Sequence, residues 1–405
     1  MRLLRLALFY TFAATTLVSN AAFAAAFQLY ELGTPVIGTA DVGQAVTEDA
    51  SASYFNPAAM TLLQDSQFML GTQALISYLN FSKNTSTTIS GDNGGNAGAI
   101  VPGFDVFYVY NYSPALRFGL NIASPYGGEL NYTDGWVGRY SVQQAFFFAV
   151  DINPSIGYRI NRWLSMGAGA TLEYLTFQQT VALPLVKDVV DGQIKVSLAD
   201  FAPGFNVGVM LTPYTSTRIG LTYRSQLVHH LHGNSIFLRI DTQPNTTTSM
   251  VMPSNAILSV AQDISNQFTV LGELGWADWS SMRNSIVNVA NYTALTPLNW
   301  NNTYRYGLGV QFKFNPCFML QMGGSYDSSP TTASKRLPVL AMDRQVRLGA
   351  GITYLIIKNV TLGASYEYIN FGRATIQNTS SLGVLSGSYS RNYANTLQLS
   401  LNVAT

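Results

Sequence analysis

The stretch YRYGLGVQFKF, which runs from Tyr304 to Phe314, decides the fold of this chain. Bulky apolar side chains occupy every second position, and the positions between them carry Arg305, Lys313 or small and polar residues. Because side chains of a β-strand point alternately to the two faces of a sheet, this period of two predicts a strand. Charges lie only on the small face, so we expect the bulky face to meet lipid and the small face to line a crowded lumen.

The same alternation recurs through the C-terminal two thirds of the chain and predicts an antiparallel barrel. Tight turns recur about every 50 residues, the size of a hairpin with its loop, and long polar connections separate them. We predict fourteen strands, at about 67–82, 101–113, 116–124, 146–160, 164–181, 196–212, 217–232, 252–264, 267–288, 300–314, 317–328, 344–356, 359–370 and 391–404. The predicted fold class is all-β, a 14-stranded antiparallel transmembrane β-barrel with both chain ends on the periplasmic side.

The N-terminus has the pattern of a secretory signal peptide. Arg2 and Arg5 precede a short apolar run, and Ala22-Phe23-Ala24 supplies the small residues of a cleavage site. We expect cleavage after Ala24, so that residues 1–24 are the signal peptide. An exported chain whose apolar residues are spread over alternate positions suits the outer membrane of a Gram-negative bacterium.

Composition excludes some classes of protein. Charged residues make up only 11% of the chain and aromatic residues 12%, against about 25% charged residues in an average soluble domain. Basic and acidic residues nearly balance, at 22 and 21, which gives no reason to expect nucleic acid as a partner. After the signal peptide, no apolar run is long enough for a transmembrane helix.

Residues 25–66 lack the period of two. This segment is rich in Gly, Ala and Ser, and residues 42–50 and 58–63 are candidates for short helices. Two arrangements are open, a periplasmic extension and a plug inside the barrel. A 14-stranded barrel encloses more space than its own side chains fill, which favours the plug. We therefore divide the chain into a signal peptide (1–24), an N-terminal hatch or plug (25–66) and a barrel with long extracellular loops (67–405).

Motifs in a fixed order point to a known family. The hatch segment contains Phe55-Asn56-Pro57-Ala58-Ala59-Met60 after a spaced series of Gly and Ala residues. Further matches follow in order at Ser124-Pro125-Tyr126-Gly127, Trp136-Val137-Gly138-Arg139-Tyr140, residues 218–225, Asp278-Trp279-Ser280-Ser281 and residues 326–330. Over most of its mature length the chain resembles the FadL/TodX family of outer-membrane channels for hydrophobic compounds.

The resemblance implies fourteen strands with an N-terminal hatch, and passive transport of long-chain fatty acids or related hydrophobic compounds. It implies that the substrate is caught among the extracellular loops and reaches a deeper pocket. A shift of the hatch would then let it leave sideways, through a gap that an inward kink of the third strand makes. The implied kink and substrate pocket comprise Ser124, Pro125, Tyr126 and Gly127, with the hatch motif Asn56, Pro57 and Ala58 facing them.

Elementary physical chemistry agrees with such a route. An acyl chain gains about 0.8 kcal/mol per CH₂ group on leaving water, so a dry pocket attracts it and a water-filled pore does not. Pro125 donates no ladder hydrogen bond, as a kink after the regular strand 116–124 would need. An ordinary strand-ending turn is the alternative interpretation of these residues.

Several basic side chains are expected to face the lumen. A carboxylate substrate needs a basic partner, so we take Arg218, Arg224, Arg305 and Arg347 as candidates for headgroup binding. The alternative is a lumen network in which they pair with inward acids such as Glu173, Glu273, Asp327 and Glu367. The resemblance implies a basic residue on the outer half of the fifth strand in the fatty-acid members of the family. The matching residues of this chain, 171–183, contain no Lys or Arg. Neutral aromatic hydrocarbons therefore stay open as substrates.

Other functions have less support in the sequence. His229, His230 and His232 cluster, but near the outer end of a predicted strand, so we predict no metal site. No Gly-x-Ser-x-Gly elbow, dinucleotide motif or P-loop is present, so we predict no enzyme and no cofactor. A surface adhesin or receptor and a general porin are the remaining alternatives. We expect a monomer in the cell outer membrane, whose partners are a hydrophobic small molecule, membrane lipid and lipopolysaccharide.

Overall fold

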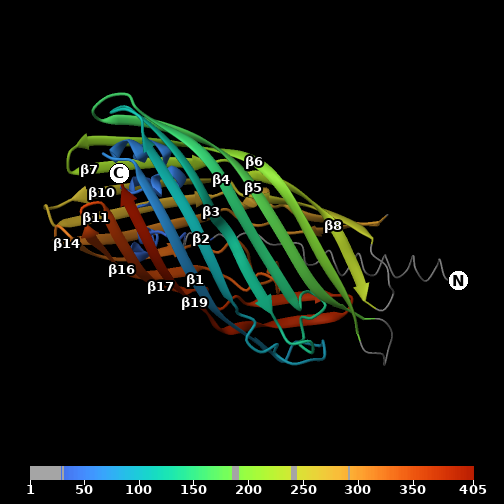
Figure 1. Cartoon of the computed structure of the whole chain (residues 1–405). Coiled ribbons are helices and arrows are strands. Elements are labelled where there is room, and N and C mark those ends of the chain that lie inside the picture. Colours follow the sequence, from blue (N-terminus) through green and yellow to red (C-terminus); the bar gives the residue numbers. More distant parts are fainter. Residues whose placement is uncertain (1–28, 30–31, 185–190, 239–243, 291) are drawn as a thin grey trace.

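A computed structural model describes Leu29 and residues 32–184, 191–238, 244–290 and 292–405. The predicted signal peptide, residues 1–24, lies outside the described residues. The strands run obliquely around one elongated barrel, and the C-terminal strand lies beside the first one (Figure 1).

Nineteen hydrogen-bonded segments form one antiparallel sheet in the described residues. They are β1 (Gln67–Lys83), β2 (Ile100–Asn111), β3 (Leu116–Asn131), β4 (Gln144–Arg159), β5 (Leu164–Leu183), β6 (Gly192–Tyr214), β7 (Thr217–Arg224), β8 (Leu227–Leu238), β9 (Asn245–Met252), β10 (Asn255–Asp263), β11 (Phe268–Ala277), β12 (Asn284–Val289), β13 (Tyr292–Pro297), β14 (Thr303–Asn315), β15 (Phe318–Asp327), β16 (Gln345–Ile357), β17 (Val360–Asn370), β18 (Ile376–Ser380) and β19 (Gly383–Ala404). β1 pairs with both β2 and β19, so the sheet closes on itself. Closure removes the two free edge strands that an open sheet would have.

Consecutive segments combine into longer strands. β7 and β8 both pair with β6, and β9 and β10 pair with β8 and β7, so each couple is one interrupted strand. β11 pairs with β14 and β12 pairs with β13, so β11–β12 and β13–β14 are each one interrupted strand as well. β17 and β18 both pair with β19 and form the last such couple. Counted in this way the barrel has fourteen strands, and the predicted fold class is confirmed.

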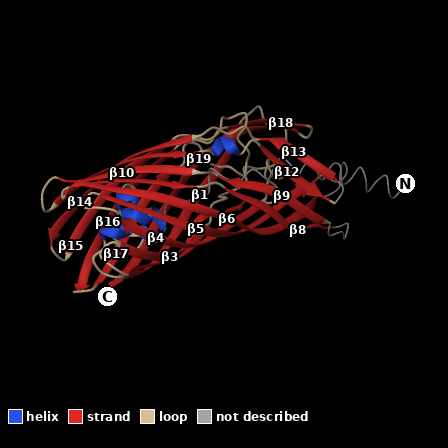
Figure 2. Ribbon diagram, turned by 90° about the horizontal axis from the view of Figure 1, so that it is seen from above, coloured by secondary structure: helices blue, strands red, loops and turns tan. Residues whose placement is uncertain are grey.

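The predicted strand bounds differ from the structure in several places. The third strand was expected to end at Ser124, but β3 continues to Asn131 because it resumes its pairing with β4 after a bulge. β9 was expected only at Met252, and β19 was expected to begin at residue 391 and not at Gly383. The segments β13 and β18 were not expected at all. Both lie at the extracellular end of the barrel, away from the C-terminus in Figure 2. There neither lipid nor a packed lumen enforces a regular alternation of side chains.

Residues 32–63, which we call the hatch, lie inside the barrel near the end that holds the C-terminus (Figure 2). They form the short helices η1 (Pro35–Thr39), η2 (Gln44–Val46), α2 (Ala52–Phe55) and η3 (Pro57–Leu62). Small residues permit close contact with the wall. A Cβ added to Gly71 would lie 1.8 Å from the carbonyl oxygen of Gly33, and one added to Gly208 would lie 1.9 Å from Asn56 Oδ1.

The lumen differs between its two halves. In the extracellular half the inward side chains form an apolar cluster that includes Trp136, Phe147 and Phe177. Around the hatch the wall instead contributes buried charged residues such as Glu273 and Arg305. Large apolar side chains, for example Leu308 at 72% exposure, cover the outside of the barrel. Among the described residues no helix is long and apolar enough to cross a membrane.

Candidate functional site

The hydrogen-bond ladder between β2 and β3 stops partway along the barrel wall. β3 pairs with β2 from Arg117 to Ile122, whereas β2 continues along β1 as far as Ile100. Between Ala123 and Tyr126, β3 also shifts its register on β4. The described strands have no β2–β3 pair beyond Ile122, and we call this interruption the ladder gap.

One buried carboxylate takes the place of ladder hydrogen bonds at the gap. Asp105 of β2 is fully buried. Its two carboxylate oxygens accept hydrogen bonds from the backbone N–H of Ser124 on β3 and of Gly33 in the hatch, both at 2.8 Å. Both hydrogen bonds are buried, and a buried backbone N–H that lost its partner there would cost about 1–3 kcal/mol. Asp105 therefore ties β2, the bent β3 and the start of the hatch together.

The chain ahead of the hatch also contacts the bent strand. The backbone N–H of Leu29 donates to the carbonyl oxygen of Pro125 at 2.8 Å. A Cβ added to Gly127 would lie 3.1 Å from Leu29 Cδ1, so these residues are in close contact. Tyr126 is buried and meets the ring of Phe147 edge to face, with centroids 6.5 Å apart. Leu29 thus lies against the β3 bulge, on its lumen side.

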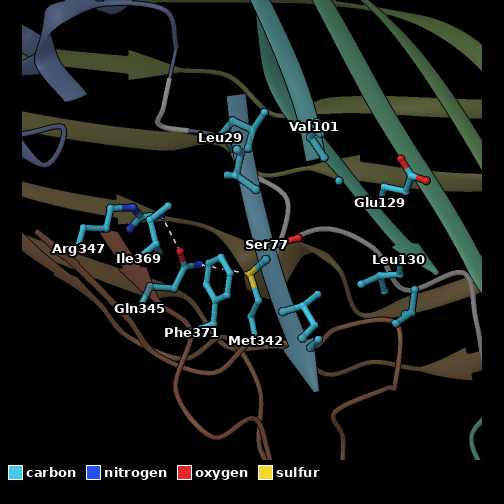
Figure 3. A pocket seen from close by; sticks show the side chains of 16 residues that line it. Leu29, Ser77, Val101, Glu129, Leu130, Met342, Gln345, Arg347, Ile369 and Phe371 are labelled. Carbon is cyan, nitrogen blue, oxygen red and sulfur yellow. Dashed lines mark hydrogen bonds between the residues drawn. The ribbon is translucent and has the colours of Figure 1, made fainter. Parts of the chain in front are cut away.

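An apolar cavity of about 550 Å³ lies beside the ladder gap. Figure 3 shows its walls, which come from β1, β2, β3, β16, the end of β17 with Phe371 after it, and Leu29. The connection between β15 and β16 covers it with Val339, Ala341 and Met342. Val101 and Gly127, on opposite sides of the ladder gap, both line it. Its lining is mostly apolar with few polar groups, as is usual for small-molecule sites.

The cavity has one basic residue among its described lining residues, Arg347. Its guanidinium pairs with Asp327 through Nη1 and donates to Gln345 Oε1 through Nη2 at 2.6 Å. Its Nε lies 3.9 Å from an Asp41 carboxylate oxygen in the hatch. Arg347 is 1% exposed. The one cation at the cavity is therefore already neutralised by protein carboxylates.

The other three predicted headgroup residues also pair with acids of the protein. Arg218 bridges Glu48 and Asp263, each at 2.8 Å. Arg224 lies 3.2 Å from Asp151, and Arg305 lies 3.9 Å from Glu273. None of the three lines the apolar cavity. The structure thus gives the predicted arginines the paired lumen network that the sequence left open as the alternative.

The predicted hatch motif holds the hatch together rather than touching the bulge. Asn56 Oδ1 accepts from the N–H of Ala58 at 3.1 Å, and Nδ2 donates to the carbonyl oxygens of Ala45 at 2.7 Å and Val209 at 3.2 Å. Asn56 is fully buried and Pro57 begins η3. Leu29 donates a hydrogen bond to the bulge at Pro125, and Gly33 is connected to Ser124 through Asp105.

Sequence reasoning missed two contributors to this region. Asp105 is an inward acid on a strand whose other inward residues are uncharged, and that isolated position was a usable signal. Asp41 gave no such signal, because its partners Arg305 and Arg347 lie 264 and 306 residues away along the chain. Of the histidines, His229 is buried with Nε2 at 3.0 Å from Glu173, while His230 and His232 face outward. In the described part of the chain no group of three or more metal-ligating side chains is placed to hold a metal ion.

Comparison with known proteins covers nearly the whole chain. A family model described as outer membrane protein transport protein (OMPP1/FadL/TodX) matches residues 15–404. Outer membrane protein P1 of Haemophilus influenzae is 25% identical over 91% of both chains. The long-chain fatty acid transport protein of Escherichia coli O6:H1 is 23% identical over 88% of this chain and 89% of that protein. A crystal structure of a Pseudomonas aeruginosa FadL homologue superposes with a TM-score of 0.87, at 18% identity, over 94% of this chain and 100% of that one, which shows a shared fold.

Proposed function

The chain belongs to the OMPP1/FadL/TodX family of outer membrane transport proteins, and from that premise we propose that it carries long-chain fatty acids or related hydrophobic compounds by passive diffusion. Members of the family are transport channels and not enzymes. The protein is accordingly a multi-pass outer membrane protein that transports hydrophobic compounds. Our proposal concerns the finer points, which are the substrate, the part played by the hatch and the way out of the barrel.

The observation that carries the proposal is the apolar cavity whose wall contains the ladder gap. The lumen side of this wall is apolar, because Val101, Gly127 and Leu130 line it. A hydrocarbon chain gains about 0.8 kcal/mol for each CH₂ group that leaves water, so it partitions into such a cavity. A sideways exit between β2 and β3 releases it into the bilayer without a second contact with water.

A downward exit is less favourable for such a molecule. Beneath the hatch a second cavity has a mixed lining, in which apolar residues alternate with polar ones that include Arg218, Gln311 and Lys313. An acyl chain that passed there would lose the free energy gained by leaving water. We therefore propose that the hatch, with Leu29 ahead of it, moves to open the way from the cavity to the ladder gap, and continues to block the periplasmic end.

A second candidate substrate class is neutral, such as aromatic hydrocarbons. What favours it is the pairing of Arg347 with Asp327, together with Glu129 as a further lining residue of the cavity. A carboxylate headgroup would have to compete with Asp327 for the one cation at the cavity, and an uncharged molecule would not. Long-chain fatty acids remain our first proposal because the hydrophobic gain grows with chain length.

Uptake by whole cells tests the proposal. Gram-negative cells that lack their own long-chain fatty acid channel would express this protein and receive labelled oleate or labelled toluene. We expect uptake of at least one of them to rise about tenfold over cells with an empty vector, a difference worth about 1.4 kcal/mol. Uptake of toluene alone would select the neutral substrate class. Uptake of neither, with the protein folded in the outer membrane, would reject the proposal.

A further inference from the structure

Arginines of the barrel wall surround the hatch and contact it. Their partners in the hatch are backbone carbonyl oxygens, the ring of Tyr54 and the carboxylates of Glu48 and Asp41. In the described residues these arginines are Arg117, Arg159, Arg218, Arg224, Arg305 and Arg347. Arg347 differs from the other five because it also lines the apolar cavity.

The contact of Arg347 with the hatch is a charge cluster around Asp41. One Asp41 carboxylate oxygen lies 3.9 Å from Arg305 Nη2 and 3.9 Å from Arg347 Nε. Arg305 Nη2 also donates to the carbonyl oxygen of Ala40 at 2.7 Å. These side chains are at most 2% exposed. Removing one member of such a buried pair is strongly destabilising, because it leaves a charge without compensation.

The hatch segment that the cluster holds has a strained backbone. Ala40 and Asp41 adopt positive φ values of 54° and 59°, a conformation that residues other than glycine seldom take. Such a conformation persists only where surrounding contacts impose it. Here Ala40 and Asp41 follow η1, and their backbone N–H groups donate to the carbonyl oxygens of Ile37 and Val36, each at 3.0 Å. From the barrel wall, the arginines and Ser325 also contact the turn, and Ser325 donates to the carbonyl oxygen of Ala40 at 3.0 Å. If the cluster weakens, this turn relaxes and the hatch shifts with it.

Arg347 joins this turn to the cavity through short contacts. Its Nη2 donates to Gln345 Oε1 at 2.6 Å, and Gln345 Nε2 donates to Met342 Sδ at 3.9 Å, as the dashed lines in Figure 3 mark. Met342, Gln345 and Arg347 all line the cavity. A molecule that fills the cavity therefore presses on side chains that fix the position of the Arg347 guanidinium.

We propose that Arg347 and Asp41 are a positioning pair that links filling of the cavity to release of the hatch. With the cavity empty, Arg347 holds Asp41 and the strained turn stays in place. A hydrophobic molecule in the cavity displaces Gln345 and Arg347, Asp41 loses one of its two cations, and the turn relaxes. This inference deepens the proposed function, because the effect of a ligand on the pair rests on that function. The hold of the pair on the hatch does not require a substrate.

Ion conductance in planar lipid bilayers tests the pair, because a closed hatch blocks ions whether or not a substrate exists. We would compare the wild type, Asp41→Asn, Arg347→Gln and the double variant without ligand. Each single change should raise the frequency of open events at least about tenfold, as expected for the loss of one buried charge partner. The double variant should exceed the single ones by less than about twofold, because both changes remove the same interaction. Arg139→Gln breaks an extracellular ion pair with Asp191 and should behave as the wild type.

Addition of oleate to the same bilayers tests the link to the cavity. Oleate should raise opening of the wild type at least about tenfold and change Asp41→Asn by less than about twofold. The proposal is overturned if Asp41→Asn stays closed without ligand, if the two changes add, or if oleate opens Asp41→Asn as it opens the wild type. Oleate could fail to raise the frequency of open events of the wild type while Asp41→Asn is already open without ligand. This result would count against the proposed substrate but leave the hold of the pair on the hatch established. Asp41 lies outside the barrel strands, so its variant provides the test even if Arg347→Gln does not fold.

Discussion

Replacing Gly127 by Phe is expected to lower the uptake of labelled oleate at least about tenfold, an effect worth about 1.4 kcal/mol. Gly127 lines the apolar cavity at the β3 bulge, and its φ is one that any residue can adopt. The atom nearest to an added Cβ is Cδ1 of the flexible Leu29 side chain, at 3.1 Å, and atoms of Phe148 and Val101 follow at 3.6 and 3.8 Å. A phenyl ring at this position would fill the passage between the cavity and the ladder gap without breaking the barrel.

A matched control is available on another strand of the barrel. At Gly272 of β11 an added Cβ would meet no atom within 4 Å. Gly272→Phe therefore adds the same side chain far from the gap, and its uptake should equal that of the wild type. Both variants should keep the heat-dependent gel mobility of a folded barrel. Normal uptake by a folded Gly127→Phe would show that the substrate does not pass this bulge.

Replacing Asn56 by Ala is expected to lower uptake at least about fivefold by displacing the hatch. The Asn56 side chain makes buried hydrogen bonds with Ala58 and Ala45 and a partly buried one with Val209. A buried polar group that loses its partner costs about 1–3 kcal/mol, and loss of a helix N-cap costs about 1 kcal/mol. Alanine offers neither interaction, so η3 and the turn at Ala45 lose their connection.

Limited proteolysis from the periplasmic side would accompany the uptake measurement for Asn56→Ala. We expect faster cleavage within the hatch and an intact barrel. Asn234→Ala serves as the control, because Asn234 is an exposed residue of β8. If Asn56→Ala transports at the wild-type rate although its hatch is cleaved faster, the hatch motif has no part in transport.

The barrel could be predicted from sequence because lipid and lumen impose opposite demands on alternate residues. For β14, predicted as 300–314 and observed as Thr303–Asn315, the alternation alone was sufficient. The alternation did not predict strands where lipid and lumen no longer impose these opposite demands on alternate residues. β13 and β18 lie at the extracellular end, and β3 resumes after its bulge, so no regular pattern marks them.

The candidate site was less accessible to sequence reasoning. Parity placed Arg305 and Arg347 in the lumen correctly, because parity follows from the strand alone. Their partners depend on the path of the hatch. Asp41 approaches Arg347 across more than about 300 residues of sequence, and no local pattern encodes that contact. The same holds for Leu29 on Pro125 and for Gly33 on Asp105.

Photo-cross-linking most directly tests the claim that a hydrophobic substrate reaches the apolar cavity and leaves through the wall. A long-chain fatty acid with a diazirine near its tail would be added to cells that express the wild type, illuminated, and located on the protein by mass spectrometry. We predict adducts on Leu75, Val101 and Leu130, around the cavity and the ladder gap. Adducts confined to Gln311, Lys313 and Met319, in the polar cavity beneath the hatch, would contradict a sideways exit and indicate passage straight into the periplasm.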